Sequence, residues 1–482
     1  MNFVSIDFAI FLPIVFCLHW VILKFNFKLQ NALLLAASYV FYSYWDWRFL
    51  GLIFVSSLVD FNVGLALEKN TNKKQRKWLL ISSLIFNLGL LGFFKYANFF
   101  LDSFVDSFQF FGQDINVNRL NIILPVGISF YTFQTLSYTI DIYRKKIKAS
   151  HDPIAFFAFV SFFPQLVAGP IERASNLLPQ FSRKRNFDYL NAVDGLRQIL
   201  WGLFKKVVIA DNCAFFVDII FANSADYSGS ALLLGAILFS FQIYGDFSGY
   251  SDIAIGTSRL FGIKLMKNFA FPYFSRDIAE FWRRWHISLS TWFRDYLYIP
   301  LGGSRVGKWL NIRNVFIVFI VSGFWHGANW TFVFWGGLNA LYFLPLLLLK
   351  KNRNHTGDIA PGRALPSLKV LMQITLTFSM TIFAWIFFRA ESLTHAFNYI
   401  GDIFSTTLFT VPNVTGKQKL VILGLLMIGF LVIEWKGRNQ EYAIEKFALQ
   451  WSRPFRWVFY YLLSFMVYYH SGAEVDFIYF QF

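Results

Sequence analysis

Two histidines beside tryptophan are the residues best suited to chemistry in this sequence. His326 lies in the run Val321-Ser-Gly-Phe-Trp-His-Gly-Ala-Asn-Trp330, inside an apolar segment. An imidazole titrates near neutral pH and can take a proton from a hydroxyl group, so His326 could act as a general base. An ionisable group at such a position is a functional candidate by default. A histidine that only hydrogen-bonds between packed helices would fit the same pattern.

The second histidine, His286, lies in the segment Glu280–Pro300, which is rich in tryptophan and arginine. Its apolar residues recur at intervals of three and four, namely at Trp282, Trp285, Leu289, Trp292 and Tyr296. This spacing predicts one apolar face on a single helix. Arg283, Arg284 and Arg294 lie off that face, which is typical of an amphipathic helix at a membrane–water interface. From the residues alone, an anchoring helix with an incidental histidine is the favoured interpretation of this segment.

A third polar stretch, Tyr244-Gly-Asp-Phe-Ser-Gly-Tyr-Ser-Asp252, interrupts another apolar run. Such residues are too polar to contact lipid, so we expect them to face a cavity or partner helices. Asp246 and Asp252 could orient a histidine or hold a substrate hydroxyl group. They could equally form a structural polar network.

Apolar segments of membrane-spanning length surround these residues. Of the 482 residues, 56% are hydrophobic and 15% are charged, whereas soluble chains carry about 25% charged residues. Because a spanning helix needs about 20 mostly apolar residues, we predict an all-α, polytopic integral membrane protein with 11–12 transmembrane helices. The candidate spans lie near residues 8–23, 30–45, 49–67, 78–100, 121–141, 199–222, 230–260, 314–330, 332–349, 368–388, 419–434 and 457–470. Residues 154–171 end in Ala-Gly-Pro and predict a re-entrant or interfacial segment.

The distribution of lysine and arginine predicts the orientation of the chain. Residues 69–77 and 144–148 are strongly basic, whereas residues 101–118 and 393–416 contain neither lysine nor arginine. Cytoplasmic loops collect basic residues, so the first two segments should face the cytoplasm and the last two the outside. The net charge of +16 is explained by this pattern, and we expect no nucleic-acid partner.

Cysteine content and repeats limit the remaining possibilities. Only Cys17 and Cys213 occur, so a disulfide framework is excluded as an organising feature. The histidines and cysteines lack the spacing of a zinc site, and we expect neither a metal nor a bound prosthetic group. The sequence contains no fixed-period repeat and no long linker, which predicts one integrated domain over residues 1–482.

The segments that contain both histidines resemble the membrane-bound O-acyltransferase family, and within it the bacterial alginate O-acetyltransferase branch. The similarity extends over about residues 120–345, with a weaker echo near the C-terminus. The matching pieces are Pro125–Gln134, Phe163–Pro170, Tyr244–Tyr250, Glu280–Arg305, Gly323–Ala328, Phe388–Ser392 and Phe477–Phe480. This resemblance implies a multi-helix disc in the bacterial plasma membrane, with a tunnel that joins its two faces.

The resemblance also implies roles for individual residues. His326 matches the family's catalytic histidine and His286 its second characteristic histidine. We expect Trp325, Asn329 and Asp246 to bind substrate. The expected donor is acetyl-CoA or an acyl-carrier thioester, and the expected acceptor is a surface or secreted polysaccharide, acylated directly or through an extracytoplasmic esterase-like acetyltransferase.

Two alternatives remain open from the sequence. One is D-alanyl transfer to a wall polymer by an enzyme of the same class. The other is a polysaccharide or lipid transporter without chemistry, which would predict paired broken spans in two related halves. We find no such symmetry in the sequence, and the histidine segments occur once.

Overall fold

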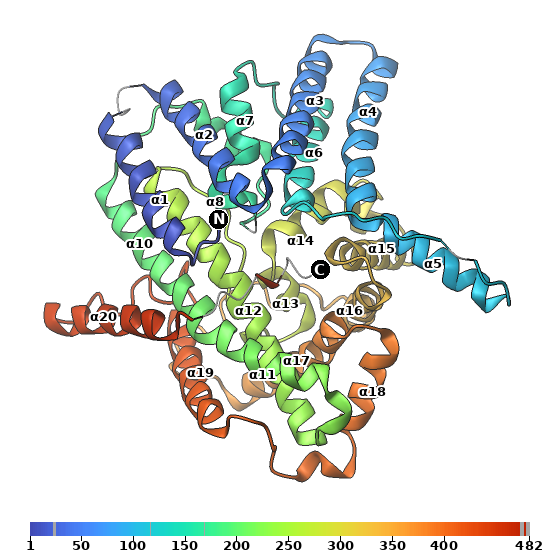
Figure 1. Ribbon diagram of the computed structural model, residues 1–482, viewed down its shortest axis with the longest axis vertical. Helices are drawn as coiled ribbons and strands as arrows, with labels where there is room; N and C mark the ends of the chain where they lie inside the picture. Colours follow the sequence, from blue (N-terminus) through green and yellow to red (C-terminus); the bar gives the residue numbers. More distant parts are fainter. Residues whose placement is uncertain (23–25, 116, 168, 473–476, 479–482) are drawn as a thin grey trace. The chain divides into compact units, whose positions relative to one another are not determined.

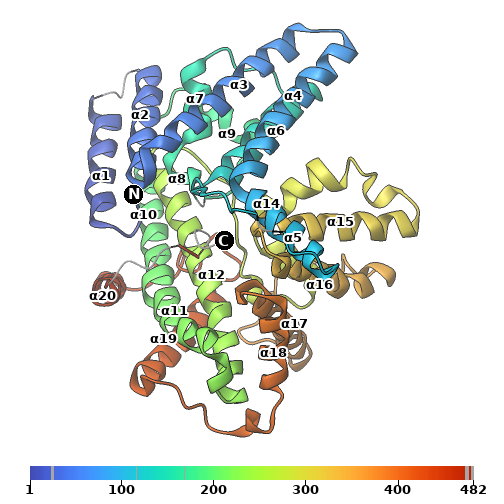
Figure 2. The ribbon, with the colours of Figure 1, turned by 45° about the vertical axis from the view of Figure 1, so that its right-hand side comes forward.

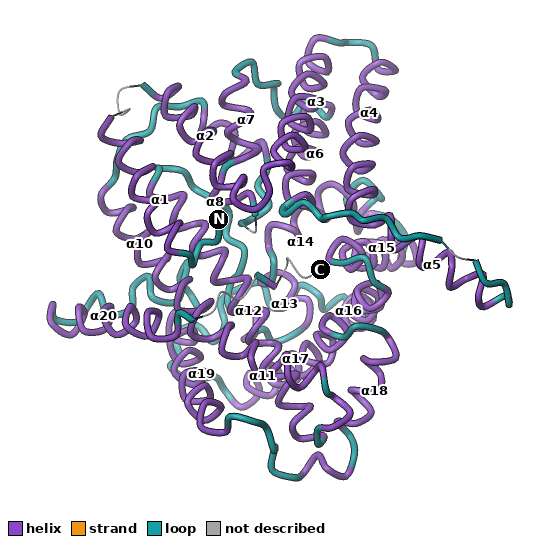
Figure 3. Tube along the Cα trace, in the orientation of Figure 1, coloured by secondary structure: helices purple, strands orange, loops and turns teal. Residues whose placement is uncertain are grey.

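The computed structural model describes residues 1–22, 26–115, 117–167, 169–472 and 477–478, which form helices and loops without strands (Figure 3). Ala168, Tyr479 and Phe480, which belong to the matching sequence pieces, lie outside the described residues. The predicted all-α fold is confirmed. Contacts divide the chain into two compact units, residues Met1–Ala192 with Thr257–Met266 and residues Val193–Gly256 with Lys267–Phe482. The prediction of a single integrated domain stays a prediction.

The first unit is made mainly of the N-terminal helices, coloured blue to teal in Figure 1. Its α-helices are α1 (Ile6–Cys17), α2 (Phe27–Asp46), α3 (Leu50–Lys69), α4 (Lys73–Leu91), α5 (Ala97–Phe110), α6 (Ile128–Tyr143), α7 (Pro153–Ser161), α8 (Phe163–Leu166) and α9 (Ala174–Phe181). Short 3-10 or π-helical turns join some of them, namely η1 (Leu18–Ile22), η2 (Trp47–Phe49) and η3 (Gly92–Tyr96).

Helices α3, α4 and α6 lie side by side in this unit (Figure 2) and enclose a polar network. Asp60 on α3 is fully buried and accepts hydrogen bonds from Ser83 Oγ at 2.6 Å and Asn87 Nδ2 at 2.8 Å, both on α4. The Ser83 hydroxyl also lies 3.2 Å from Thr139 Oγ1 on α6. Each polar group has a partner, which is the condition for burying such groups between helices.

The second unit contains the remaining helices, and two of its helices, α10 (Tyr189–Leu203) and α12 (Gly229–Leu260), extend across the division of the chain. The others are α11 (Asp211–Ala222), α13 (Ile278–Arg284), α14 (Ile287–Phe293), α15 (Lys308–His326), α16 (Trp330–Leu348), α17 (Leu368–Arg389), α18 (Leu393–Ile403), α19 (Lys417–Gly437) and α20 (Arg453–His470). The shorter turns are η4 (Phe204–Ala210), η5 (Ser224–Asp226), η6 (Pro272–Phe274), η7 (Arg294–Tyr298), η8 (Gly303–Arg305) and η9 (Thr406–Phe409).

Helices α15 and α16 form a close pair in the second unit (Figure 1, Figure 2). Gly323 on α15 and Gly336 on α16 allow the close approach. A Cβ atom at Gly323 would collide with the carbonyl group of Phe332, and one at Gly336 with that of Phe319. Small residues let helix backbones approach in this way. The pair fixes the position of His326, because this residue ends α15.

Six helical stretches of the described residues are long and apolar enough to cross a membrane. They are Phe27–Lys69, Lys73–Phe110, Gly229–Leu260, Trp330–Leu348, Leu368–Arg389 and Lys417–Gly437. The spans predicted near residues 8–23, 121–141, 199–222, 314–330 and 457–470 fall on helices that are shorter or more polar than this criterion requires. The prediction of 11–12 crossings and their orientation therefore stays a prediction.

The segment Glu280–Pro300 differs from the single amphipathic helix that its apolar stripe predicts. It is divided into α13, α14 and the π-helical turn η7. Trp285 is extended, with φ −100° and ψ 130°, and His286 adopts the left-handed region, with φ 44° and ψ 55°. The prediction of one continuous stripe was wrong because tertiary hydrogen bonds fix this turn against the local helical pattern.

Candidate active site

His326 lies in an aromatic enclosure at the corner between α15 and α16. Its ring centroid lies 5.0 Å from Trp325, 5.2 Å from Trp335 and 5.3 Å from Phe388, and its side chain is buried. The chain leaves α15 directly after His326, and α16 begins at Trp330. The imidazole therefore lies at the end of a rigid helix rather than on a mobile loop.

His286 lies in the left-handed turn between α13 and α14 and is also buried. The Phe247 ring of α12 contacts its imidazole edge-on, with ring centroids 4.7 Å apart. The turn is outside the six stretches that could cross a membrane. Burial lowers the pKa of His286 to about 3, so this imidazole stays neutral at neutral pH.

The structure brings the two predicted histidines together, although they come from different elements. Their ring centroids lie 6.1 Å apart. Trp325 contacts both rings, at 5.9 Å from His286 and 5.0 Å from His326. Their catalytic roles, and substrate binding by Trp325, stay predictions. The pair can supply a proton acceptor and a hydrogen-bond donor to one reacting group, which is what acyl transfer to a hydroxyl group requires.

The other two residues predicted to bind substrate make structural contacts. Asn329 caps α16 by accepting a hydrogen bond from Thr331 N at 2.9 Å, and its amide donates to the carbonyl of Glu391 at 3.0 Å. Asp246 is buried on α12 and accepts a hydrogen bond from the backbone N–H of Ile478 at 2.6 Å. Neither contact tests a role in substrate binding, which stays a prediction for both residues.

A buried ionic cluster, which the sequence did not reveal, lies around the π-helical turn η4. Lys205 Nζ lies 2.6 Å from Asp252 Oδ2, and Lys206 Nζ lies 2.8 Å from both Asp211 Oδ1 and Asp246 Oδ1. The two lysines lie inside the apolar run near residues 199–222. A charged residue in such a run needs a buried partner, and this is the sequence feature that could have predicted the cluster. Asp246 and Asp252 are therefore members of a buried network of ion pairs.

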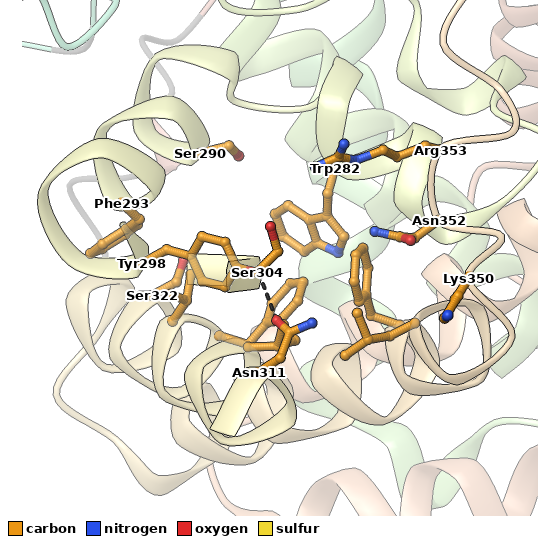
Figure 4. Close-up of a pocket in the computed structure, with 15 residues that line it drawn as sticks. Trp282, Ser290, Phe293, Tyr298, Ser304, Asn311, Ser322, Lys350, Asn352 and Arg353 are labelled. Carbon is orange, nitrogen blue, oxygen red and sulfur yellow. Dashed lines mark hydrogen bonds between the residues drawn. The ribbon is translucent and has the colours of Figure 1, made fainter. Parts of the chain in front are cut away.

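A pocket of about 480 Å³ opens among residues of α13 to α16 and the loop that follows (Figure 4). Ser322, one helical turn before His326, lines it, and so does Trp282, whose ring lies 5.6 Å from that of Trp335. Its walls are largely apolar, with Lys350, Asn352 and Arg353 at another part of the lining. The complete lining is Trp282, Ser290, Phe293, Tyr298, Ser304, Asn311, Val315, Val318, Phe319, Ser322, Phe343, Leu347, Lys350, Asn352 and Arg353. Its size suits a small-molecule ligand.

Arginines hold the loop that supplies the basic part of this lining, residues 350–366. Arg283 donates hydrogen bonds to the carbonyls of Asn352 at 2.8 Å and His355 at 2.7 Å. Arg284 reaches the carbonyl of Gly357 at 3.0 Å, and Arg438 reaches that of Ile359 at 2.9 Å. The sequence placed Arg283 and Arg284 off the apolar face of a helix, and the structure adds that they fix a neighbouring loop.

No group of three or more histidine, cysteine, aspartate or glutamate side chains that could hold a metal ion occurs in the described part of the chain. The expectation that the protein binds neither a metal nor a prosthetic group stays a prediction.

A protein-family model described as the membrane-bound O-acyltransferase family (MBOAT) matches residues 34–388. The chain belongs to the MBOAT family. It is therefore an O-acyltransferase, and it is a multi-pass protein of the bacterial plasma membrane. Both histidines of the candidate site lie within the matched residues.

Two relatives of this MBOAT protein carry names that describe O-acetylation. The chain is 40% identical over 423 residues to the probable alginate O-acetylase AlgI of Pseudomonas aeruginosa, which covers 86% of this chain and 78% of the relative. It is 38% identical over 415 residues to the peptidoglycan O-acetyltransferase of Helicobacter pylori, covering 80% and 76%. A teichoic acid D-alanyltransferase of Bacillus subtilis is 27% identical over 291 residues, covering 57% of this chain and 71% of the relative.

Proposed function

We propose that this MBOAT protein transfers an acetyl group from a cytoplasmic thioester donor across the plasma membrane to hydroxyl groups of a surface or secreted polysaccharide. The observation that carries the proposal is the buried pair His286 and His326, with ring centroids 6.1 Å apart. Neither histidine lines the pocket of about 480 Å³, but Ser322, one helical turn before His326, does. A base and a neutral donor next to a ligand-sized pocket are the parts that acyl transfer needs.

In this proposal, His326 acts as the general base. It removes the proton from the acceptor hydroxyl group while the hydroxyl oxygen attacks the thioester carbonyl. The carbon–sulfur bond then breaks, and the proton passes from His326 to the leaving thiolate, so the products are an ester and a thiol. The low pKa of His286, about 3, makes it a poor base, so it suits a neutral hydrogen-bond donor to the developing oxyanion.

The pocket supports a thioester donor with a long, partly polar arm. Its apolar walls lead toward Ser322, one turn before His326, and the basic side chains Lys350 and Arg353 could attract phosphate groups. The indole Nε1 of Trp282 has no hydrogen-bond partner among the described residues. This N–H group is therefore free to donate to a carbonyl oxygen of the donor. Acetyl-CoA and an acyl-carrier thioester share this chemistry.

Relatedness favours acetyl over D-alanyl transfer. The P. aeruginosa and H. pylori relatives, which are named for O-acetylation, are 40% and 38% identical and cover 86% and 80% of this chain, whereas the B. subtilis D-alanyltransferase is 27% identical and covers 57%. We therefore propose the acetyl group, and we propose that an extracytoplasmic esterase-like transferase takes part if the acetyl group is not passed directly to the polymer.

The proposal is tested in a strain that lacks this protein. Wild-type protein should restore alkali-labile acetate on the polysaccharide, whereas His326→Gln should lower it by about 10²–10⁴-fold at equal membrane levels. Gln keeps hydrogen-bonding capacity but cannot act as the base. Release of D-alanine instead of acetate would replace the acetyl proposal with D-alanyl transfer. Loss of polymer export, rather than of its ester groups, would favour a transporter.

A further inference from the structure

The buried Asn268 is hydrogen-bonded to the left-handed turn at His286, beside a backbone bond from Ala270 N to the carbonyl of Arg284 at 2.9 Å. Its backbone carbonyl accepts a hydrogen bond from Ile287 N at 2.9 Å. Its side-chain Oδ1 accepts one from Ser288 Oγ at 2.9 Å and lies 3.4 Å from Ser288 N. The two residues that directly follow His286 are therefore both bonded to Asn268, which is fully buried.

The other side of Asn268 is fixed to α12. Its Nδ2 donates to Ser251 Oγ at 3.2 Å. Helix α12 also carries Phe247, whose ring contacts His286 with centroids 4.7 Å apart. Asn268 thus connects the turn to the same helix that packs against the imidazole, so one rigid element fixes both the backbone and the ring of His286.

The turn needs such support for two reasons. A residue with a side chain rarely adopts the left-handed region unless surrounding contacts over-determine it. In addition, the apolar residues of this segment, including Trp282, Trp285 and Leu289, have the spacing of one continuous helix. Without the bonds from Asn268, the local sequence would favour joining α13 to α14, and each helical residue turns by about 100° relative to its neighbour. That change would rotate His286 away from His326.

We propose that Asn268 is a positioning residue, which holds His286 in the left-handed turn and thereby directs its imidazole toward His326. The part of the proposal that concerns the reaction rests on the proposed function. The part that concerns the geometry of the turn does not depend on it.

The first measurement needs no catalytic activity. The detergent-purified full-length protein is treated with diethyl pyrocarbonate, and mass spectrometry follows the rate at which His286 is modified. Asn268→Ala keeps the backbone bond to Ile287 N but removes the side-chain bonds to Ser288 and Ser251. It should raise that rate at least tenfold, because the loosened turn makes the buried imidazole accessible. The control is Asn87→Ala, which removes a similarly buried and multiply hydrogen-bonded asparagine in the first unit. This control should leave the modification rate of His286 unchanged.

The second measurement is polysaccharide acetylation in cells, where Asn268→Ala should cause at least a tenfold loss. Ser288→Ala removes only one of the bonds and should shift both measurements in the same direction by a smaller factor. If Asn268→Ala does not accumulate as folded protein, the Ser288→Ala variant tests the positioning proposal in its place. A His286 that stays protected in these variants would overturn the proposal, whether or not acetylation falls.

His286→Gln separates this proposal from the proposed function. If His286→Gln keeps full acetylation, the reaction role of His286 fails, while the modification rates still test the turn. If His286→Gln abolishes acetylation but Asn268→Ala exposes His286 without loss of acetylation, the proposed function stands and positioning by Asn268 is refuted.

Discussion

Two buried clusters in the second unit keep ionisable groups out of water in opposite ways. The histidine cluster surrounds His286 and His326 with aromatic rings from Phe247, Trp325 and Trp335. The ionic cluster around η4 instead pairs each lysine with carboxylates, and Lys206 lies 2.8 Å from two of them. Burial is comparable, because His286, His326 and Lys206 are at most 3% exposed.

The comparison teaches that depth alone does not distinguish a reactive site from a structural one. A lysine with two carboxylate partners can lose its charge only at the cost of both ion pairs. Burial among aromatic rings lowers the pKa of His286 to about 3, so this imidazole is neutral at neutral pH and carries no charge that needs a counter-ion. The surroundings of each group therefore separate the two roles.

The largest effect that this comparison predicts is on stability. Lys206→Met should lower the free energy of unfolding by about 3–5 kcal/mol, because Asp246 would stay buried without its cation. His326→Gln, at similar burial, should change it by about 1 kcal/mol while removing activity. Thermal unfolding of both variants in detergent measures the difference. The double variant Lys206→Met with Asp246→Asn should recover part of the loss, and no recovery would contradict the pairing argument.

A smaller effect should appear on acidification of the histidine cluster. The pKa of His286 in the folded protein, about 3, lies below its ordinary value of 6.5. The unfolded state therefore binds the proton first, so this contribution to stability is present above pH 6.5 and is lost as pH falls toward 3. The expected loss is about 2 kcal/mol between pH 6.5 and pH 5. It is measured as the difference in pH dependence between wild type and His286→Gln, and identical slopes would contradict it.

The sequence predicted the class of the fold better than its details. Long apolar runs such as that of α12 predict a helical membrane protein, because an α-helix satisfies its backbone hydrogen bonds within the one run that crosses the lipid. The break at His286 was not predictable, since Trp282, Trp285 and Leu289 have helical spacing and the opposing bonds come from the distant residues Asn268 and Ala270. Local periodicity carries no information about such tertiary partners.

The sequence predicted the two histidines of the candidate site, but not the contacts that hold the surrounding elements in place. His286 and His326 were recognisable from residue type, neighbours and family resemblance. The hydrogen bond from Arg283 to the carbonyl of His355 joins residues that are 72 positions apart. The ion pair between Lys206 and Asp246 joins two different helical elements, η4 and α12. Neither contact leaves a spacing pattern that one sequence can reveal.

The smallest predicted effect on stability is at Asn329. Substitution of this residue tests whether its side chain binds substrate or caps a helix. Its side chain caps α16 through Thr331 N, and its amide reaches the carbonyl of Glu391. Asn329→Ala should therefore cost about 1 kcal/mol of stability. Asn329→Ser keeps a capping oxygen and should recover most of that loss, with acetylation within about twofold of wild type in both variants.

Unfolding temperature and polysaccharide acetylation, measured on the same preparations of these Asn329 variants, decide between the two roles. If Asn329 acts only as a cap, acetylation should stay within about twofold of wild type in both variants, and Ser should recover the stability that Ala loses. A substrate ligand needs the amide group itself, so acetylation should fall as far in Asn329→Ser as in Asn329→Ala although Ser recovers the stability. That second outcome would return Asn329 to the substrate-binding role that its position beside His326 predicts.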